Sequence, residues 1–117
     1  MKLNLLVIRT QNPEALKCQY ELLGMTFEHH KHDKGPYHYT SEIDGIVFEI
    51  YPFTKSMTEA DGTLRLGLEV SNLKHTIDAI RNSNWIIRSD AQKMPWRITA
   101  IVQDLDGRKI ELKHKEE

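Results

Sequence analysis

Residues 44–50 read Asp-Gly-Ile-Val-Phe-Glu-Ile, and residues 106–112 read Asp-Gly-Arg-Lys-Ile-Glu-Leu. Each stretch joins an Asp-Gly turn to an alternating strand that carries one glutamate between apolar residues. The two turns and the two glutamates, Glu49 and Glu111, are both separated by 62 residues (106 − 44 and 111 − 49). This repeat indicates two copies of one module, and it predicts that two glutamates share one cavity.

The composition of the 117 residues indicates one globular domain, because 39% are hydrophobic and 28% are charged. A formal net charge of −1 favours neither nucleic acid nor an anionic membrane as a partner. No apolar run has the length of a membrane span. The chain starts without a signal-peptide pattern, and its single cysteine, Cys18, excludes an internal disulfide. We therefore expect a cytoplasmic protein.

Module 1, about residues 1–53, begins with an expected strand over residues 3–10. Asn12-Pro13 is a typical helix start, and Gly24 is a natural helix end. Further strands are predicted over residues 25–32, 37–43 and 46–52, the last two forming a hairpin.

Residues 54–62 are polar and aperiodic, so we interpret them as a linker. Module 2, about residues 63–117, then repeats the same order. Asn72 is expected to cap a helix that carries Leu73, Ile77 and Ile80 on one face. Strands are predicted over residues 63–71, 85–89, 97–103 and 108–114. The fold class is therefore α+β, with two β-α-β-β-β modules.

Three stretches make the whole chain resemble the vicinal oxygen chelate superfamily, which includes glyoxalase I, bleomycin-resistance proteins and extradiol dioxygenases. The first is the helix end Leu22-Leu23-Gly24, and the second is the strand 45–50. The third and most specific is Asp104-Leu105-Asp106-Gly107 with the strand that ends in Ile110-Glu111-Leu112. The resemblance implies that the two modules pair into an open, cup-shaped mixed sheet with the helices outside.

The resemblance also implies a four-ligand metal site in metal-dependent members, with ligands on the first and last strands of each module. Glu49 and Glu111 match the two last-strand positions. The first-strand positions carry Leu5 and Arg65 instead, and neither side chain suits a metal ion. We therefore expect no cofactor, although a divalent metal bound by the two glutamates stays an alternative.

Alternation along the strands places Arg9, Tyr51 and Arg65 on the cavity side with the two glutamates. We hypothesise that the Arg65 guanidinium takes the place of the metal and neutralises Glu49 and Glu111. The alternative is that these groups are solvated charges on an open sheet. Arg9 is expected to bind an anionic group, or to pair with Glu49 or with Glu69.

The remaining candidates surround this cavity. His38 is interpreted as a rim residue, and it belongs to a histidine group that is either a zinc site or a polar hairpin; its members are His29, His30, His32 and His38. Trp96 and Arg97 are expected either to line the pocket or to pack a loop. Cys18 is expected to be a small buried residue, and Asp104 and Asp106 are explained by turn chemistry.

The leading hypothesis is a glyoxalase- or bleomycin-resistance-like protein that binds a small polar molecule without the four-ligand metal site. One alternative is a divergent metal-dependent lyase, isomerase or dioxygenase that uses Glu49 and Glu111 as catalytic residues. A second alternative is a non-catalytic interaction module. A homodimer is expected by analogy with the family.

Overall fold

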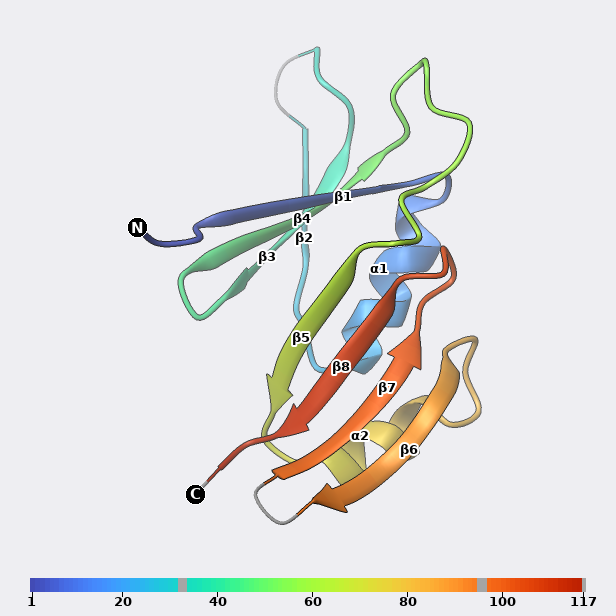
Figure 1. Cartoon of the computed structure of the whole chain (residues 1–117). Helices are drawn as coiled ribbons and strands as arrows, with labels where there is room; N and C mark the ends of the chain where they lie inside the picture. The colour runs from blue at the N-terminus through green and yellow to red at the C-terminus, as the bar shows by residue number, and fades with distance from the viewer. Residues whose placement is uncertain (32–33, 95–96, 117) are drawn as a thin grey trace. The chain divides into compact units, whose positions relative to one another are not determined.

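The computed structural model describes residues 1–31, 34–94 and 97–116, without the side chains of residues 94 and 97. The chain divides into two compact units, Met1–Ala60 and Asp61–Glu117, and each is described by itself (Figure 1). The division falls inside the polar stretch 54–62 that the sequence predicts as a linker. The expectation that both modules form a single domain stays a prediction.

The first unit is a four-stranded mixed sheet with one helix. Its elements in chain order are β1 (Leu5–Thr10), α1 (Pro13–Leu22), β2 (Glu28–His30), β3 (His38–Ile43) and β4 (Ile46–Pro52). The strand order is β1-β4-β3-β2, in which β1 and β4 are parallel and the other pairs are antiparallel.

The second unit repeats this topology. Its elements are β5 (Arg65–Val70), α2 (Leu73–Ile80), β6 (Ile86–Met94), β7 (Arg97–Gln103) and β8 (Lys109–His114). The strand order is β5-β8-β7-β6, and only the β5–β8 pair is parallel. The predicted α+β class with two β-α-β-β-β modules is therefore confirmed.

Both helices begin at the predicted asparagines. The side-chain oxygen of Asn12 accepts a hydrogen bond from the Ala15 amide at 3.2 Å, and that of Asn72 accepts one from the His75 amide at 3.1 Å. Each cap satisfies one amide that has no partner inside its helix. Gly24 follows α1 with a φ of 108°, which explains why a glycine ends this helix.

Each helix covers one face of the sheet in its own unit. Helix α1 packs on β1, β3 and β4, and helix α2 packs on β6, β7 and β8. The core of the first unit includes Tyr20 and Phe48, whose ring centres are 5.5 Å apart. The core of the second unit includes Ile77, Ile80, Val102, Ile110 and Leu112. In the described part of each unit, no helix lies over the opposite face of the sheet.

Several element boundaries differ from the predicted ones. Strand β2 spans three residues instead of the expected 25–32, because the chain first leaves the helix through Gly24. Strand β5 begins at Arg65, after Asp61 Oδ1 accepts hydrogen bonds from the Thr63 amide and hydroxyl at 3.0 and 2.6 Å. Strand β6 continues to Met94, past the predicted end at residue 89.

The prediction for Cys18 is wrong. Its side chain is exposed on α1, because residues 16, 19 and 20 supply the buried stripe of that helix. No helix in the described part of the chain is long and apolar enough to cross a membrane.

Candidate functional site

The turn between β3 and β4 determines which side chains meet on the uncovered face of the first sheet. Asp44 and Gly45 have φ values of 47° and 84°, as a two-residue type I′ hairpin turn requires. Ile43 therefore lies opposite Ile46, and Thr40 lies opposite Glu49. The register follows from the Asp-Gly turn of the sequence repeat.

Strand β1 extends this face on the other side of β4. Val7 lies opposite Glu49, and Arg9 lies opposite Tyr51, in the parallel pairing of β1 with β4. The side chains of β4 that point to the opposite face, Phe48 and Ile50, are buried in the core. We call the face that is uncovered by α1 the polar face; it includes Arg9, His30, His38, Thr40, Glu49 and Tyr51.

Four side chains form a row across the polar face, one from each strand. Tyr51 lies between Arg9, whose guanidinium carbon is 5.0 Å from the ring centre, and His38, whose ring is stacked at 4.3 Å with an interplanar angle of 5°. His30 continues the row, with its ring centre 5.8 Å from that of His38. Both sides of the Tyr51 ring are therefore occupied by neighbours from the same sheet.

Glu49 is the centre of the polar face, and two residues of β3 contact it. One carboxylate oxygen, Oε2, accepts a hydrogen bond from the Thr40 hydroxyl at 3.0 Å. The same oxygen lies 3.1 Å from His38 Nε2, a contact that is an ion pair only when the imidazole is protonated and that lacks the alignment of a hydrogen bond. The His38 side chain is 1% exposed and that of Glu49 is 15% exposed. A carboxylate and an imidazole are thus held together with little water around them.

The environment of Tyr51 changes its acidity. Burial raises the pKa of the Tyr51 hydroxyl above its ordinary value of 10.0, and the negative charge of Glu49 raises it further, while Arg9 opposes the shift. The hydroxyl is therefore protonated at neutral pH and able to donate a hydrogen bond.

The structure brings together four of the residues that the sequence singles out, namely Arg9, His38, Glu49 and Tyr51. Arg9 also donates from Nη1 to the Pro52 carbonyl oxygen at 3.0 Å. Sequence reasoning missed Thr40, although the two-residue turn that places it opposite Glu49 is visible in the sequence.

The histidine group does not form a metal cluster in the described residues. His30 Nε2 lies 2.9 Å from the exposed Glu28 carboxylate, and His29 stacks on Tyr37 and Tyr39 on the other side of the strand. No group of three or more His, Cys, Asp or Glu side chains within residues 1–31, 34–94 and 97–116 is arranged to hold a metal ion. His32 lies outside the described residues.

The side chains on the first strands do not supply the ligands that a four-ligand metal site needs. The parallel pairings place Val7 opposite Glu49 and Gly67 opposite Glu111. Neither residue has a ligand atom on its side chain, and the same holds for Leu5.

In the second unit, Arg65 and Glu111 share the uncovered face of the sheet, but they are not direct partners. Arg65 lies opposite Lys109, and its exposed side chain makes no ion pair or hydrogen bond with the described residues of its module. Arg65 and Glu111 are diagonal neighbours in this register, and the Arg65–Glu111 half of the bridge stays a prediction. The half that joins Arg65 to Glu49 spans the two units and stays a prediction.

Two further candidates on the loop before β7 are not placed by the structure. Trp96 lies outside the described residues, and the backbone of Arg97 begins β7 while its side chain is outside the description. Their expected contribution to a pocket stays a prediction.

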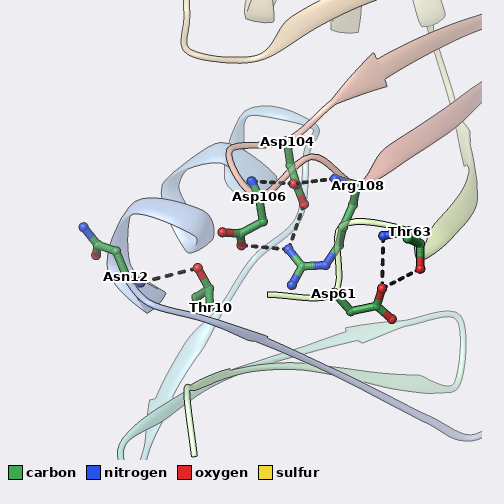
Figure 2. A network of polar contacts seen from close by, with 7 residues as sticks. All are labelled: Thr10, Asn12, Asp61, Thr63, Asp104, Asp106 and Arg108. Atoms are coloured by element: carbon green, nitrogen blue, oxygen red, sulfur yellow. Dashed lines mark hydrogen bonds and ion pairs between the residues drawn. The ribbon is translucent and has the colours of Figure 1, made fainter. Parts of the chain in front are cut away.

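A second polar network in the second unit stabilises the turn before β8 (Figure 2). Asp104 Oδ1 accepts from the amides of Asp106 and Arg108 at 2.9 and 3.1 Å. The Arg108 guanidinium donates from Nη1 to Asp104 Oδ2 at 3.2 Å and to Asp106 Oδ2 at 2.8 Å. The turn chemistry expected for the two aspartates agrees with these contacts.

Arg108 itself was not predicted to be buried, yet its side chain is 1% exposed. Burial lowers its pKa, but hydrogen bonds to Asp106 and the charge of Asp104 outweigh this effect, so the pKa of the Arg108 guanidinium is raised above its ordinary value. Arg108 precedes Ile110 and Leu112 by two and four residues, so the alternation of side chains along a strand already indicates that it points inward with them.

Comparisons with known proteins concern the fold alone. No protein-family model and no curated protein sequence matches the chain. Among solved structures, the chain is similar to TnmS3, an antibiotic binding protein from Streptomyces sp. CB03234, with 18% identity and a TM-score of 0.74. That match covers 99% of this chain and 97% of TnmS3.

Two other solved structures carry superfamily names. A member of the glyoxalase/bleomycin resistance protein/dioxygenase superfamily from Sphaerobacter thermophilus is 14% identical over 98% of both chains, with a TM-score of 0.71. A mutant of glyoxalase I from Zea mays is 14% identical, with a TM-score of 0.80, over 99% of this chain and 45% of that one. The chain therefore has the fold of the glyoxalase, bleomycin resistance protein and dioxygenase superfamily, as its sequence resemblance predicts.

Proposed function

We propose that the protein binds a small polar organic molecule on the polar face of the first sheet. The observation that supports this most strongly is the Glu49 carboxylate, held at Oε2 by Thr40 and His38 on the face away from the helix. Burying a charged or polar group away from water lowers the stability of the fold unless other protein groups form hydrogen bonds or ion pairs with it. Such a group at one point of a sheet is therefore a candidate for binding a ligand.

The fold supports the same class of function. TnmS3 is an antibiotic binding protein of similar fold, so this architecture is compatible with binding an organic compound. Fold alone does not carry a function. The polar face adds hydrogen-bonding groups of this chain that can orient a ligand, namely the Glu49 carboxylate and the Tyr51 hydroxyl.

A thermal-shift screen of small amines, carboxylic acids and neutral amides tests the proposal. A compound that binds only the folded state at about a hundred times its Kd should raise the Tm by about 10 °C. The increase should be lost in Tyr51→Ala and retained in His75→Ala, which changes an exposed histidine on α2. If no compound of these three classes raises the Tm, the chain fits the interaction module better than the binding protein.

We also propose that this site works without a tightly held divalent metal. The support is the set of side chains facing the two glutamates on the first strands, which offers no ligand atoms at Leu5, Val7 or Gly67. The metal-dependent alternative has one observation in its favour, because His38 Nε2 and Glu49 Oε2, two ligand types, are 3.1 Å apart.

Equilibrium dialysis against Zn²⁺, Mn²⁺, Ni²⁺ and Mg²⁺ separates these two possibilities. We expect only weak binding of Zn²⁺ and Ni²⁺, and His30→Ala should remove it. Stoichiometric binding that is lost in both Glu49→Gln and Glu111→Gln would instead support the metal-dependent enzyme.

We also propose that the protein is a homodimer in solution. Light scattering of the same preparation measures its mass and tests this proposal.

A further inference from the structure

We propose that the ligand of the polar face presents a protonated amine to the Glu49 carboxylate and an apolar group to β1. The inference rests on the proposed function and specifies its ligand class: an organic ammonium ion with an apolar body, rather than an organic anion. It follows from the second carboxylate oxygen of Glu49, Oε1, and from the apolar side chains of β1 beside Glu49.

The two oxygens of Glu49 are used unequally. Oε2 takes both the Thr40 hydroxyl and the His38 imidazole. Oε1 makes no hydrogen bond or ion pair with the residues that the structure describes. A carboxylate that is only 15% exposed gains most from a charge-assisted partner on its second oxygen, and an ammonium group supplies one.

The surface beside Glu49 is apolar on the β1 side. Val7 lies directly opposite Glu49, and Leu5 lies one step further along the same side of the strand. These two side chains are 36% and 49% exposed, on a sheet whose other face is buried. They offer a contact for the apolar body of a ligand whose charged end reaches Glu49.

Tyr51 limits the ways in which a ligand can bind. Its ring has Arg9 on the β1 side and His38 on the β3 side, so stacking on this ring is not open to a ligand. Its hydroxyl makes no hydrogen bond with any described residue, and the raised pKa keeps it protonated at neutral pH. The hydroxyl can therefore accept a hydrogen bond from the ammonium group or donate one to a neighbouring oxygen of the ligand.

The cations on this face do not favour an anionic ligand. Arg9 is engaged, because Nη1 donates to the Pro52 carbonyl oxygen and the guanidinium lies over the Tyr51 ring. His38 is 1% exposed and directs Nε2 to Glu49. An anion that approached the centre of the face would meet the Glu49 charge first.

A titration with benzylammonium chloride, followed by amide chemical shifts in two-dimensional NMR, tests the inference. Sodium benzoate and benzyl alcohol are the anionic and neutral comparisons of similar size. We expect benzylammonium to shift the amides of Thr40, Glu49 and Tyr51 saturably, and to bind at least about tenfold more tightly than benzoate.

Two matched variants attribute the effect to Glu49. Glu49→Gln keeps the side-chain shape and removes the charge, so affinity for benzylammonium should fall by about tenfold. Glu42→Gln removes an exposed charge from the same side of β3 and should change affinity by less than about twofold. Thermal unfolding of both variants confirms that they are folded.

The outcomes separate this inference from the proposed function. If benzoate or benzyl alcohol shifts the same amides as strongly as benzylammonium, the polar face binds ligands but the preference for an amine is wrong. If benzylammonium shifts nothing, or binds Glu49→Gln equally well, the inference is overturned. In either case the thermal-shift screen still decides whether the face binds a compound of another class.

Discussion

The Glu49 carboxyl group is only 15% exposed, and its two neighbours on β3 compensate for the lost solvent. Thr40 and His38 both contact Oε2 of the carboxylate, so Oε1 has neither of them as a partner. The contributions of Thr40 and His38 to stability should therefore depend on each other, because both residues contact the same oxygen. Removing Thr40 leaves a poorly solvated acceptor without its hydrogen-bond donor, and removing His38 takes away the 3.1 Å contact with Nε2, so either change costs free energy.

His38→Ala should lower the free energy of unfolding by about 1–3 kcal/mol, because Glu49 loses a partner and Tyr51 loses its stacked ring. Urea unfolding measures this change, and His75→Ala is the matched control at an exposed position. In a Glu49→Gln background the cost of His38→Ala should be smaller, since the charge is gone. Equal costs in both backgrounds would show that His38 acts through packing alone.

The pKa of Tyr51 is a direct measure of the local charge. It is raised by burial first and by Glu49 second, so it should fall in Glu49→Gln and stay unchanged in Glu42→Gln. NMR of the Tyr51 ring carbon beside the hydroxyl follows this titration. A Tyr51 pKa that does not change when Glu49 is neutralised would contradict the arrangement.

The same shift predicts how stability depends on pH. In the unfolded chain Tyr51 has its ordinary pKa of about 10, and in the folded protein the pKa is higher. The folded state therefore retains the proton longer, and this contribution is fully present below about pH 10 and is lost as pH rises through the folded pKa. Tyr51→Phe should remove this part of the alkaline loss of stability.

At the scale of elements, the Asp44-Gly45 turn determines the site, because it fixes the register of β3 on β4. Gly45 has a φ of 84°, a backbone conformation that residues with a Cβ atom rarely adopt. Gly45→Ala should therefore lower the free energy of unfolding by about 1–2 kcal/mol. Urea unfolding again measures the change.

Gly67 is the matched comparison for this prediction. It lies within β5, and a Cβ there would meet no heavy atom within 4 Å. Gly67→Ala should leave stability unchanged or raise it by up to about 1 kcal/mol, because alanine has less freedom in the unfolded chain. Equal losses from both substitutions would contradict the turn as the source of the register.

The elements were the part of the molecule that the sequence predicted best. Both helix caps, the Asp44-Gly45 hairpin and the alternation of buried residues along β1, β4 and β8 agree with the structure. The reason is physical, since caps, turns and alternation act over a few residues. The boundaries were less accurate, as β2 and β6 show, because pairing with a neighbouring strand decides where a strand stops.

Contacts between side chains were harder to predict, because they depend on register. The sequence indicated that Glu49 and Arg9 share a face with Tyr51, but it did not indicate that His38 and Thr40 meet at one oxygen. The sequence also did not indicate that β5 aligns Arg65 with Lys109 and Gly67 with Glu111. A shift of two residues along a strand keeps the face and changes the partner.

At the scale of the whole molecule, the two units have the same topology and different chemistry. The first unit gathers histidine, tyrosine and threonine around Glu49. The second unit has Lys109 and Lys113 on the same strand and side as Glu111, and Gly67 opposite it on β5. The Asp-Gly turns differ as well. The first is a two-residue turn, and the second is part of the Asp104–Arg108 network. The two units of the repeat therefore share a topology and differ in the side chains on their sheets.

The most direct test of the binding site is the chemical-shift map of the compound that raises the Tm most in the thermal-shift screen. We predict that the largest changes fall on Thr40, Glu49 and Tyr51, and that the side-chain carboxyl carbon of Glu49 shifts with them while that of Glu42 does not. Changes centred on α1, α2 or the second sheet, with the Glu49 signal unmoved, would contradict the assignment of the polar face as the binding site.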